Sequence, residues 1–439
     1  MNQAPAVPGT VAASDPSRNR ATSAFQSLEL DTRLLGMIVA LAAIWIFFNV
    51  LSNGQFITPR NLWNLSVQSA AVAIMATGMV LIIVSRNIDL SIGSVLGLTG
   101  MAMAMLQAEW IPRTFGLGFD QPWTWIVTLA FGLVLGAMIG GLQGFVIAYI
   151  GVPSFIVTLG GLLVWRGLSF QLAQGQTIAP LDTTFQLLGG GPRGALGANL
   201  SWLVAGLVCA AIAYSLVTGR RRRRRYGFPL RPMSAEIAIG ILGCVLAIGA
   251  VWVANSYPWP SQLASDFAAA NGIEEPPGGL IIPTGIAIPV LIAIGVAVAM
   301  TFMATRRRFG RYVFSIGGNP DAANLAGINT RRTIMMTFVI MGILSAISAA
   351  VLSARLNAAT VGLGTQTELY VIAAAVIGGT SFAGGIGTIP GAVLGAVVMQ
   401  SLQSGMLLLR VDSPIQDIVV GLVLVAAVGF DTIIRRRAT

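Results

Sequence analysis

The residue types most often used for chemistry are scarce in this chain of 439 residues. It contains no Lys and no His, and its two Cys residues, Cys209 and Cys244, lie inside apolar segments. A phosphate-binding loop of the Walker type needs a Lys, and zinc sites or proton relays built on His need that residue. We interpret the two Cys residues as inert packing residues. The chain is therefore predicted to have no nucleotide-hydrolysing site of its own and not to be an enzyme.

A few charged residues fall inside or beside the apolar segments, where an unpaired charge is costly. Asp89 follows Arg86 by three residues, a spacing that permits an ion pair on one helix face. Asp89 could equally cap a helix that begins at Leu90, or it could take part in gating. Arg166 and Glu368 are expected to be paired or to lie at the membrane interface.

Uncharged polar side chains inside the apolar segments are the other candidates for function. Each could line a path for a polar solute or form a hydrogen bond between helices, and the sequence leaves both interpretations open. The candidate pathway residues are Asn64, Gln68, Asp89, Ser91, Ser154, Phe155, Thr158, Thr380 and Ser381, with Gln143 and Gln171 as further polar residues of the same kind.

The polar stretch 305–332, between two long apolar runs, predicts one short capped helix. Asn319 is a good N-cap, Pro320 suits the first helical position, and Asp321 favours the positive end of a helix. Gly327 can end the helix in a left-handed conformation. The face with little side-chain bulk consists of Ala322, Ala323 and Ala326. Such a helix could enter a groove of another protein or lie against the membrane, and both remain open.

The elements that must position these residues are long apolar helices. The chain is 55% hydrophobic and 10% charged, whereas a soluble domain carries about 25% charged residues. A membrane-spanning helix needs about 20 apolar residues. The apolar segments are 34–52, 65–85, 88–107, 123–149, 153–172, 200–218, 236–255, 280–304, 333–354, 368–384, 388–409 and 414–434. We predict an all-α fold, a polytopic transmembrane helical bundle of about 10–12 spans, some of them broken or re-entrant.

Two local patterns refine this prediction. Segment 368–384 is the weakest span, because it begins with Glu368 and ends in glycines, so it could be re-entrant. Small residues that recur every four positions allow helices to approach closely within the chain. They are Gly132, Gly136 and Gly140 in one segment, and Gly391 and Gly395 in another.

Arginine clusters predict the orientation, because positively charged loops stay in the cytoplasm. They precede the first segment and follow the sixth, eighth and last, so all four share one side if twelve segments cross. The net charge of +10 is therefore explained by orientation rather than by nucleic-acid binding, and the run Arg220–Arg225 could anchor to lipid phosphate or dock a partner. The predicted parts are a disordered cytoplasmic tail (1–33), a transmembrane domain (34–434) and a cytoplasmic C-terminus (435–439). Within the domain we predict a basic cytoplasmic loop (219–235), a periplasmic loop (256–279) and the cytoplasmic loop 305–332.

Four stretches together resemble a known family. Residues 309–328 (FGRYVFSIGGNPDAANLAGI) closely resemble the cytoplasmic coupling segment of bacterial ABC-type sugar importer permeases of the ribose/xylose/arabinose group. Residues 87–94 (NIDLSIGS), 152–160 (VPSFIVTLG) and 378–388 (GGTSFAGGIGT) are similar to other motifs of that family, in the same order. The likeness runs from about residue 34 to 434. Residues 218–280 depart from the shorter ribose-type permeases and look like the D-xylose permease branch.

The resemblance implies a permease subunit of an ATP-driven monosaccharide importer, in a bacterial inner (plasma) membrane with both termini cytoplasmic. It implies D-xylose as the sugar, with ribose and arabinose left open. The implied partners are a second permease copy, two ATP-binding cassette subunits and a periplasmic sugar-binding protein. ATP would bind the partner subunits, and this chain would bind no cofactor or metal. The residues implied in coupling to the ATPase are Gly317, Gly318, Asn319, Pro320, Asp321, Ala322, Ala323, Ala326 and Gly327.

Two other classes of protein are alternatives to this interpretation. A self-contained secondary sugar transporter driven by an H⁺ or Na⁺ gradient could use Asp89 and Glu368 as coupling carboxylates, but it has no need for a capped cytoplasmic helix. A membrane-embedded enzyme would need a catalytic constellation that the spans do not offer. The amides, hydroxyls and aromatic rings of the candidate pathway residues suit a neutral sugar rather than a covalent reaction.

Overall fold

The computed structural model describes residues 32–230 and 232–436. Most of the predicted N-terminal tail (1–33) and three of the five residues of the predicted C-terminus (435–439) lie outside these described residues. Within them the chain is helical, and the strand-like pairing consists of isolated bridges such as Ile178 with Ala359. The all-α fold class predicted from the sequence is confirmed.

The helices follow the predicted apolar segments in order. Among the described residues, eight helices are long and apolar enough to cross a membrane, and Leu35–Leu51, Thr367–Ile377 and Ser413–Gly429 are shorter apolar helices. The principal α-helices are α2 (Thr32–Leu51), α3 (Pro59–Val84), α4 (Ile92–Met105), α5 (Thr124–Phe145), α6 (Ser154–Ala173), α7 (Thr183–Gln186), α8 (Gly197–Arg225), α9 (Met233–Asn255), α10 (Ser261–Asn271), α11 (Ile288–Arg306), α12 (Arg308–Gly318), α13 (Pro320–Leu325), α14 (Thr330–Leu356), α15 (Thr367–Ile377), α16 (Ile389–Leu408) and α17 (Ser413–Arg436). Short π- or 3₁₀-helices, η1 (Leu106–Thr114), η2 (Val146–Ile150) and η3 (Leu187–Gly189), extend α4, α5 and α7.

Two of the predicted spans are only partly helical. The segment predicted over 88–107 starts with non-helical backbone, and α4 begins at Ile92. In the segment predicted over 368–384, α15 ends at Ile377 and an irregular segment, 378–388, leads to α16. Its backbone is satisfied in part by a neighbouring helix, since Gly385 N donates to Val84 O at 3.0 Å. Such non-helical backbone is tolerated at membrane depth when it is buried in protein.

The predicted loops contain more helix than expected. The basic run predicted within the loop 219–235 lies largely on α8, which continues to Arg225. The predicted loop 256–279 contains α10, and the stretch 305–332 contains α12 as well as the single short helix that was expected there. The arginine side chains can reach lipid phosphate while their backbone stays helical, so charge alone does not end a helix.

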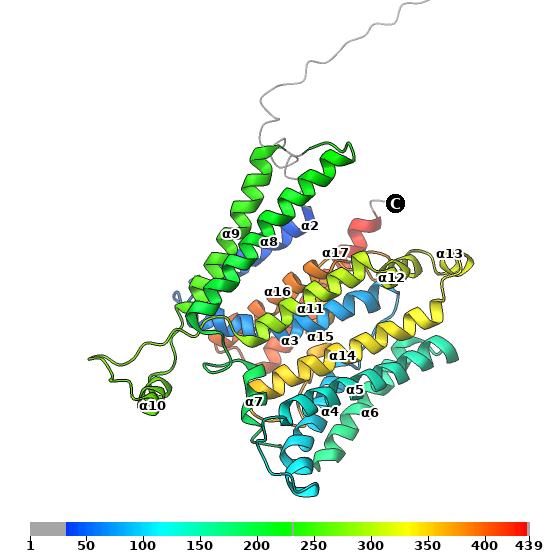
Figure 1. The fold of residues 1–439 in the computed structure, drawn as a ribbon. Coiled ribbons are helices and arrows are strands. Elements are labelled where there is room, and N and C mark those ends of the chain that lie inside the picture. Colours follow the sequence, from blue (N-terminus) through cyan, green and yellow to red (C-terminus); the bar gives the residue numbers. More distant parts are fainter. Residues whose placement is uncertain (1–31, 231, 437–439) are drawn as a thin grey trace, which may run out of the picture.

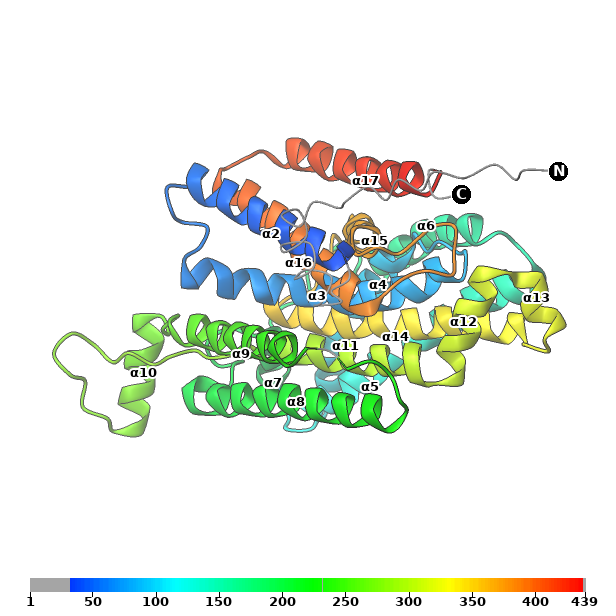
Figure 2. The same ribbon diagram turned by 90° about the horizontal axis from the view of Figure 1, so that it is seen from above.

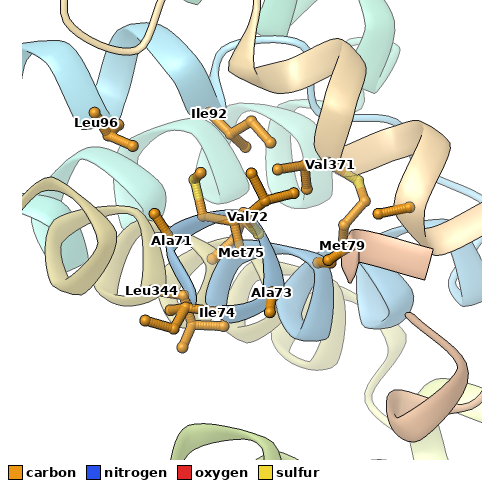
Figure 3. Close-up of a cluster of buried hydrophobic side chains, with 14 of the residues drawn as sticks. Ala71, Val72, Ala73, Ile74, Met75, Met79, Ile92, Leu96, Leu344 and Val371 are labelled. Carbon is orange, nitrogen blue, oxygen red and sulfur yellow. The ribbon is translucent and has the colours of Figure 1, made fainter. Parts of the chain in front are cut away.

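Helix α3 forms the centre of the bundle. It packs against α11, α14, α15 and α16, and 94% of its most apolar 18-residue stretch is buried. Figure 3 shows Ile74, Met75 and Met79 of α3 beside Leu344 of α14 and Val371 of α15. A helix that is apolar on all sides is expected at the middle of a membrane bundle.

The recurring glycines allow two pairs of helices to pack backbone against backbone. A Cβ atom added at Gly140 would lie 2.1 Å from the carbonyl oxygen of Phe338, so α5 and α14 touch along their backbones. A Cβ atom at Gly395 would likewise lie 2.1 Å from the carbonyl oxygen of Ala374, where α16 meets α15. The prediction that these glycines serve packing within the chain is confirmed.

The bundle has two distinct ends and one peripheral hairpin. Figure 2 shows α12 and α13 at one end and α10 at the other; we call these the α13 end and the α10 end. The turn between α8 and α9 and the last turn of α17 lie toward the α13 end (Figure 2). Helices α8 and α9 pack mainly against each other and stand away from the other helices (Figure 1).

Candidate functional site

The α13 helix has the capping predicted from its sequence. Asn319 Oδ1 accepts a hydrogen bond from Ala322 N at 3.0 Å, Pro320 is the first helical residue, and Gly327 has φ +79°. Ala323 faces the bundle and is 4% exposed, whereas the Leu325 side chain is 90% exposed. The most prominent apolar group of this helix is therefore Leu325 rather than the predicted alanine face. Leu325 is thus the apolar side chain that this helix leaves uncovered.

Helix α12 connects α13 to the bundle through Arg86, at the end of α3. Arg86 Nε donates to Gly317 O and Arg86 Nη2 donates to Gly318 O, both at 2.8 Å. These carbonyls belong to the last turn of α12, where a positive charge is favourable because the helix dipole is negative. The ion pair that the spacing of Arg86 and Asp89 permits does not form, because Arg86 has a left-handed backbone (φ +63°) and its guanidinium donates to α12 instead.

Close backbone contact at this point requires glycine. A Cβ atom at Gly317 would lie 1.8 Å from Val84 O and 2.5 Å from Gly385 N. A Cβ atom at Gly384 would lie 2.5 Å from Arg86 Cγ and 2.7 Å from Gly317 O. The end of α3, the end of α12 and the segment 378–388 thus meet without intervening side chains. We call this contact, made by Val84, Arg86, Gly317, Gly318, Gly384 and Gly385, the Arg86 junction.

The motif at 87–94 forms buried hydrogen bonds within itself and with Gln143, and a partly buried one with the motif at 152–160. Asp89 Oδ1 accepts from Ser91 N at 2.9 Å and from Ser91 Oγ at 2.6 Å, and Gln143 Nε2 donates to Ser91 Oγ at 2.9 Å. Ser154 Oγ accepts from Ile88 N at 3.3 Å. Asp89 therefore stabilises the turn before α4, which begins two residues later than the Leu90 start that was considered. These contacts fit the structural interpretation of the polar residues, because the side chains join helices to one another.

The remaining predicted pathway residues are scattered. Thr158 Oγ1 donates to Ser154 O at 2.8 Å, so its hydroxyl is used within α6. Phe155 is 51% exposed on α6, and Asn64 is half-buried on α3. Thr380 and Ser381 are both buried in the segment 378–388. These residues do not gather around one cavity.

The two costly charges, Arg166 and Glu368, do not form an ion pair. Arg166 Nη1 donates to the Thr365 hydroxyl, and Nη2 lies 3.5 Å from Ser94 Oγ. Glu368 is 9% exposed, and within the described residues its Oε2 atom has no hydrogen-bond partner. The described residues thus show no ion pair for either charge: Arg166 lies against two hydroxyls, and Glu368 is buried.

Two of the cavities between the helices have contrasting linings. A cavity of about 670 Å³ between α3, α11 and α16 is walled mainly by alanine, valine and isoleucine side chains, with Thr301, Thr305 and Arg306 toward its α13 end. A smaller cavity of about 290 Å³ lies between α3, α4, α14, α15 and α16, toward the α10 end. Its lining is rich in polar groups: Gln68, Arg355, Thr365, Thr367, Tyr370, Gln400 and Gln403. Of the predicted pathway residues, Gln68 lines this polar cavity.

Several residues with a notable place in the fold are not among those predicted from the sequence. The predicted contact face of α13 consists of alanines and does not include Leu325, and neither Gln400 nor Gln403 is among the candidate pathway residues. Two amides three residues apart in an apolar span lie on one helix face, so this pair was a visible signal. Arg355 and Tyr370 carried no such signal, because their place in the cavity depends on how α14 and α15 pack.

Comparisons with known proteins identify the family. Residues 61–218 and 183–428 match the family described as branched-chain amino acid transport system / permease component. No solved structure matches the chain.

Curated relatives match almost the whole chain. The xylose transport system permease protein of Escherichia coli (strain K12) is 37% identical over 412 residues, 93% of this chain and 94% of the relative. The corresponding protein of Haemophilus influenzae is 35% identical, covering 93% of this chain and 98% of the relative. The ribose import permease protein of Escherichia coli (strain K12) is 29% identical, covering 90% and 92%. The chain therefore belongs to the family of branched-chain amino acid and sugar permeases of ABC transporters, as a multi-pass, non-catalytic membrane subunit of the sugar-importing kind.

Proposed function

We propose that this chain is the permease subunit of an ATP-driven importer that carries D-xylose across the inner membrane of a bacterium. The single observation that carries the coupling part of the proposal is the α12–α13 segment, a helical projection tied to the bundle by the Arg86 junction. The choice of D-xylose is supported by the relatives named for xylose transport, which match 93% of the chain at 35–37% identity.

The proposed assembly has two permease copies, two ATP-binding subunits and a periplasmic sugar-binding protein. ATP binds the partner subunits, and this chain binds no cofactor. The α13 end faces the cytoplasm, because the arginines at the ends of α8 and α11 and at the start of α14 lie toward it. The α10 end then faces the periplasm and receives sugar from the binding protein.

Coupling in this proposal is mechanical. Closure of the ATP-binding subunits moves α13, which contacts them through Leu325. The hydrogen bonds of Arg86 transmit this movement from α12 to α3 and to the segment 378–388. A bundle with two packed arrangements can then alternate between inward-open and outward-open states, with the partner supplying the difference in free energy.

Reconstitution tests the proposal. The purified chain is placed in liposomes with the ATP-binding subunits, with ATP enclosed and the sugar-binding protein added outside. Uptake of radiolabelled D-xylose is then measured. We expect uptake that needs ATP and all three components. ATP-driven uptake of ribose but not D-xylose would overturn the choice of sugar and leave the importer intact.

The alternative is a secondary transporter that uses an ion gradient. The buried carboxylate of Glu368, with an unpartnered Oε2 atom, is the observation that favours keeping this alternative. The same liposomes separate the two functions when they contain the chain alone and an H⁺ or Na⁺ gradient. Sugar uptake by the chain alone, abolished in Glu368→Gln, would replace the importer with the secondary transporter.

A further inference from the structure

We infer that the polar cavity near the α10 end binds a neutral monosaccharide within a single copy of the chain. This inference rests on the proposed function and adds to it a location and a set of binding groups. The polar cavity is the one lined by Gln68, Arg355, Thr365, Thr367, Tyr370, Gln400 and Gln403.

The position of the cavity is the first argument. It lies between α3, α14, α15 and α16, and Ala71 and Val72 of α3 and Leu96 of α4 (Figure 3) form its apolar wall. Polar side chains inside a membrane bundle are costly unless their hydrogen bonds are met, and they mark substrate pathways. Seven polar or charged residues line this space, contributed by α3, α14, α16 and α15 with the loop before it, and this is more than helix packing requires here.

The amide groups supply both donors and acceptors. Gln400 Nε2 donates to Gln403 Oε1 at 2.6 Å and lies 3.3 Å from Gln68 Oε1. Within the described residues, the Nε2 atoms of Gln68 and Gln403 donate no hydrogen bond. The hydrogen bonds among these three glutamines therefore leave two amide NH₂ groups and the Gln400 side-chain carbonyl oxygen available to a ligand. A molecule with several hydroxyls, each both donor and acceptor, complements this set.

Arg355 and Tyr370 narrow the ligand class. Both side chains are half-buried, and no carboxylate of the described residues lies within ion-pair distance of Arg355. A planar guanidinium can donate to two neighbouring hydroxyls at once. The Tyr370 ring offers an apolar face for the C–H groups of a sugar ring and a hydroxyl at its tip. Amides outnumber charges in the lining, which favours a neutral polyol over an organic anion.

The volume agrees with one sugar ring. The cavity measures about 290 Å³, whereas ligand pockets cover about 300–1,000 Å³. A ligand at the lower limit of this range is a monosaccharide rather than a disaccharide. Uncharged amides also predict weak binding, which allows the sugar to leave for the other side of the membrane.

Cysteine protection tests the site directly. Cys209 and Cys244 are the two cysteines of the chain, and both are replaced by alanine. Gln403→Cys then places a thiol in the cavity, and Gln171→Cys places a matched thiol on the exposed surface of α6. Membranes containing the full chain are treated with a small methanethiosulfonate reagent, with D-xylose, D-ribose or D-xylonate present in separate samples. We expect D-xylose or D-ribose to slow labelling of Gln403→Cys at least fivefold and to leave Gln171→Cys unchanged.

The outcomes decide the inference separately from the proposed function. Protection by neither sugar, equal protection of both thiols, or protection by D-xylonate alone would overturn the site.

Uptake by the reconstituted importer gives an independent measurement. We expect Gln68→Leu and Gln403→Leu to lower uptake at least tenfold while ATP hydrolysis stays stimulated by the loaded binding protein. Gln176→Leu, in the exposed loop after α6, should change neither. Normal uptake in both cavity variants overturns the site, while absent uptake by the unmodified chain overturns the proposed function alone.

Discussion

At the scale of single residues, Arg86 connects three parts of the chain that are far apart in sequence. Its guanidinium bonds to α12 across 231 residues, and its neighbour Val84 accepts from Gly385 of the segment 378–388. Arg86 itself has φ +63°, a backbone conformation that costs a non-glycine residue of order 1–3 kcal/mol and persists only where its surroundings impose it. The side chain thus offsets a local cost by fixing the junction.

Replacing Arg86 by glycine changes both the backbone strain and the hydrogen bonds of the Arg86 junction. Arg86→Gly relieves the strained backbone but removes two charged hydrogen bonds, each worth about 1.5–3 kcal/mol. We expect transport driven by ATP to fall at least tenfold, while the melting temperature of the purified chain changes by less than it does for a core variant. The measurements are uptake in proteoliposomes and thermal unfolding in detergent.

Asn53 supplies the matched control for this prediction. It has φ +51° in the exposed turn between α2 and α3, so Asn53→Gly makes the same backbone change outside the junction. We expect Asn53→Gly to transport normally. Normal transport by Arg86→Gly would show that the junction does not carry the coupling.

Leu325 gives a second prediction at this scale. Its side chain is 90% exposed, so Leu325→Ser removes no contact within the chain. We expect the variant to fold normally but to retain the ATP-binding subunit at least fivefold less well in a pull-down from solubilised membranes. The control is Phe228→Ser, at another exposed apolar residue (62%) in the turn after α8, and this variant should retain its partner. Loss of the partner in both variants, or in neither, would contradict a specific contact at α13.

At the scale of elements, the glycine-lined contact between α5 and α14 sets how closely the helices pack. A Cβ atom at Gly140 would meet the carbonyl oxygen of Phe338 at 2.1 Å, whereas one at Gly160 on α6 would meet nothing within 4 Å. Overpacking a tight contact costs about 1–3 kcal/mol. We therefore expect Gly140→Ala to lower the melting temperature measurably, and Gly160→Ala to leave it unchanged or raise it because alanine favours helix. Equal melting temperatures for the two variants would contradict the backbone contact.

Sequence predicts an element well when its causes are local. The cap at Asn319 and Pro320, the left-handed Gly327 and the early end of α15 before Gly378 all follow from residues within one helical turn. The helical continuation of α8 to Arg225 was missed, because a run of arginines resembles a loop although arginine is a good helix former.

The candidate site was harder to predict than the elements. Gln68 stands out in the sequence as an isolated amide in a span, yet its hydrogen-bond partner Gln400 lies 332 residues away in the chain. Spacing in the sequence suggests Asp89 as a partner of Arg86, because it can reveal only near neighbours. In the fold, Arg86 donates to a carbonyl of α12 and Asp89 accepts from Ser91. Contacts between distant segments depend on which helices adjoin, and hydropathy does not specify this.

At the scale of the whole molecule, the two ends of the bundle differ in what they offer. The α13 end carries an exposed leucine and arginine-rich helix ends, and the Arg86 junction lies beside it. The α10 end has the polar cavity in its interior and the extended connection that contains α10. A permease fed by a binding protein and driven by an ATPase needs such unlike ends, because each partner must meet its own surface.

This asymmetry predicts which end lies on which side of the membrane. In a chain with Cys209→Ala and Cys244→Ala, Leu325→Cys places one thiol on α13, and Phe267→Cys places another on α10, where the native side chain is 41% exposed. Because arginine-rich ends remain in the cytoplasm, a maleimide that does not cross membranes should label Phe267→Cys in intact cells. It should label Leu325→Cys only after the cells are permeabilised. The reverse pattern would place α13 in the periplasm, where no ATP-binding subunit could reach it, and the coupling proposed here would then be wrong.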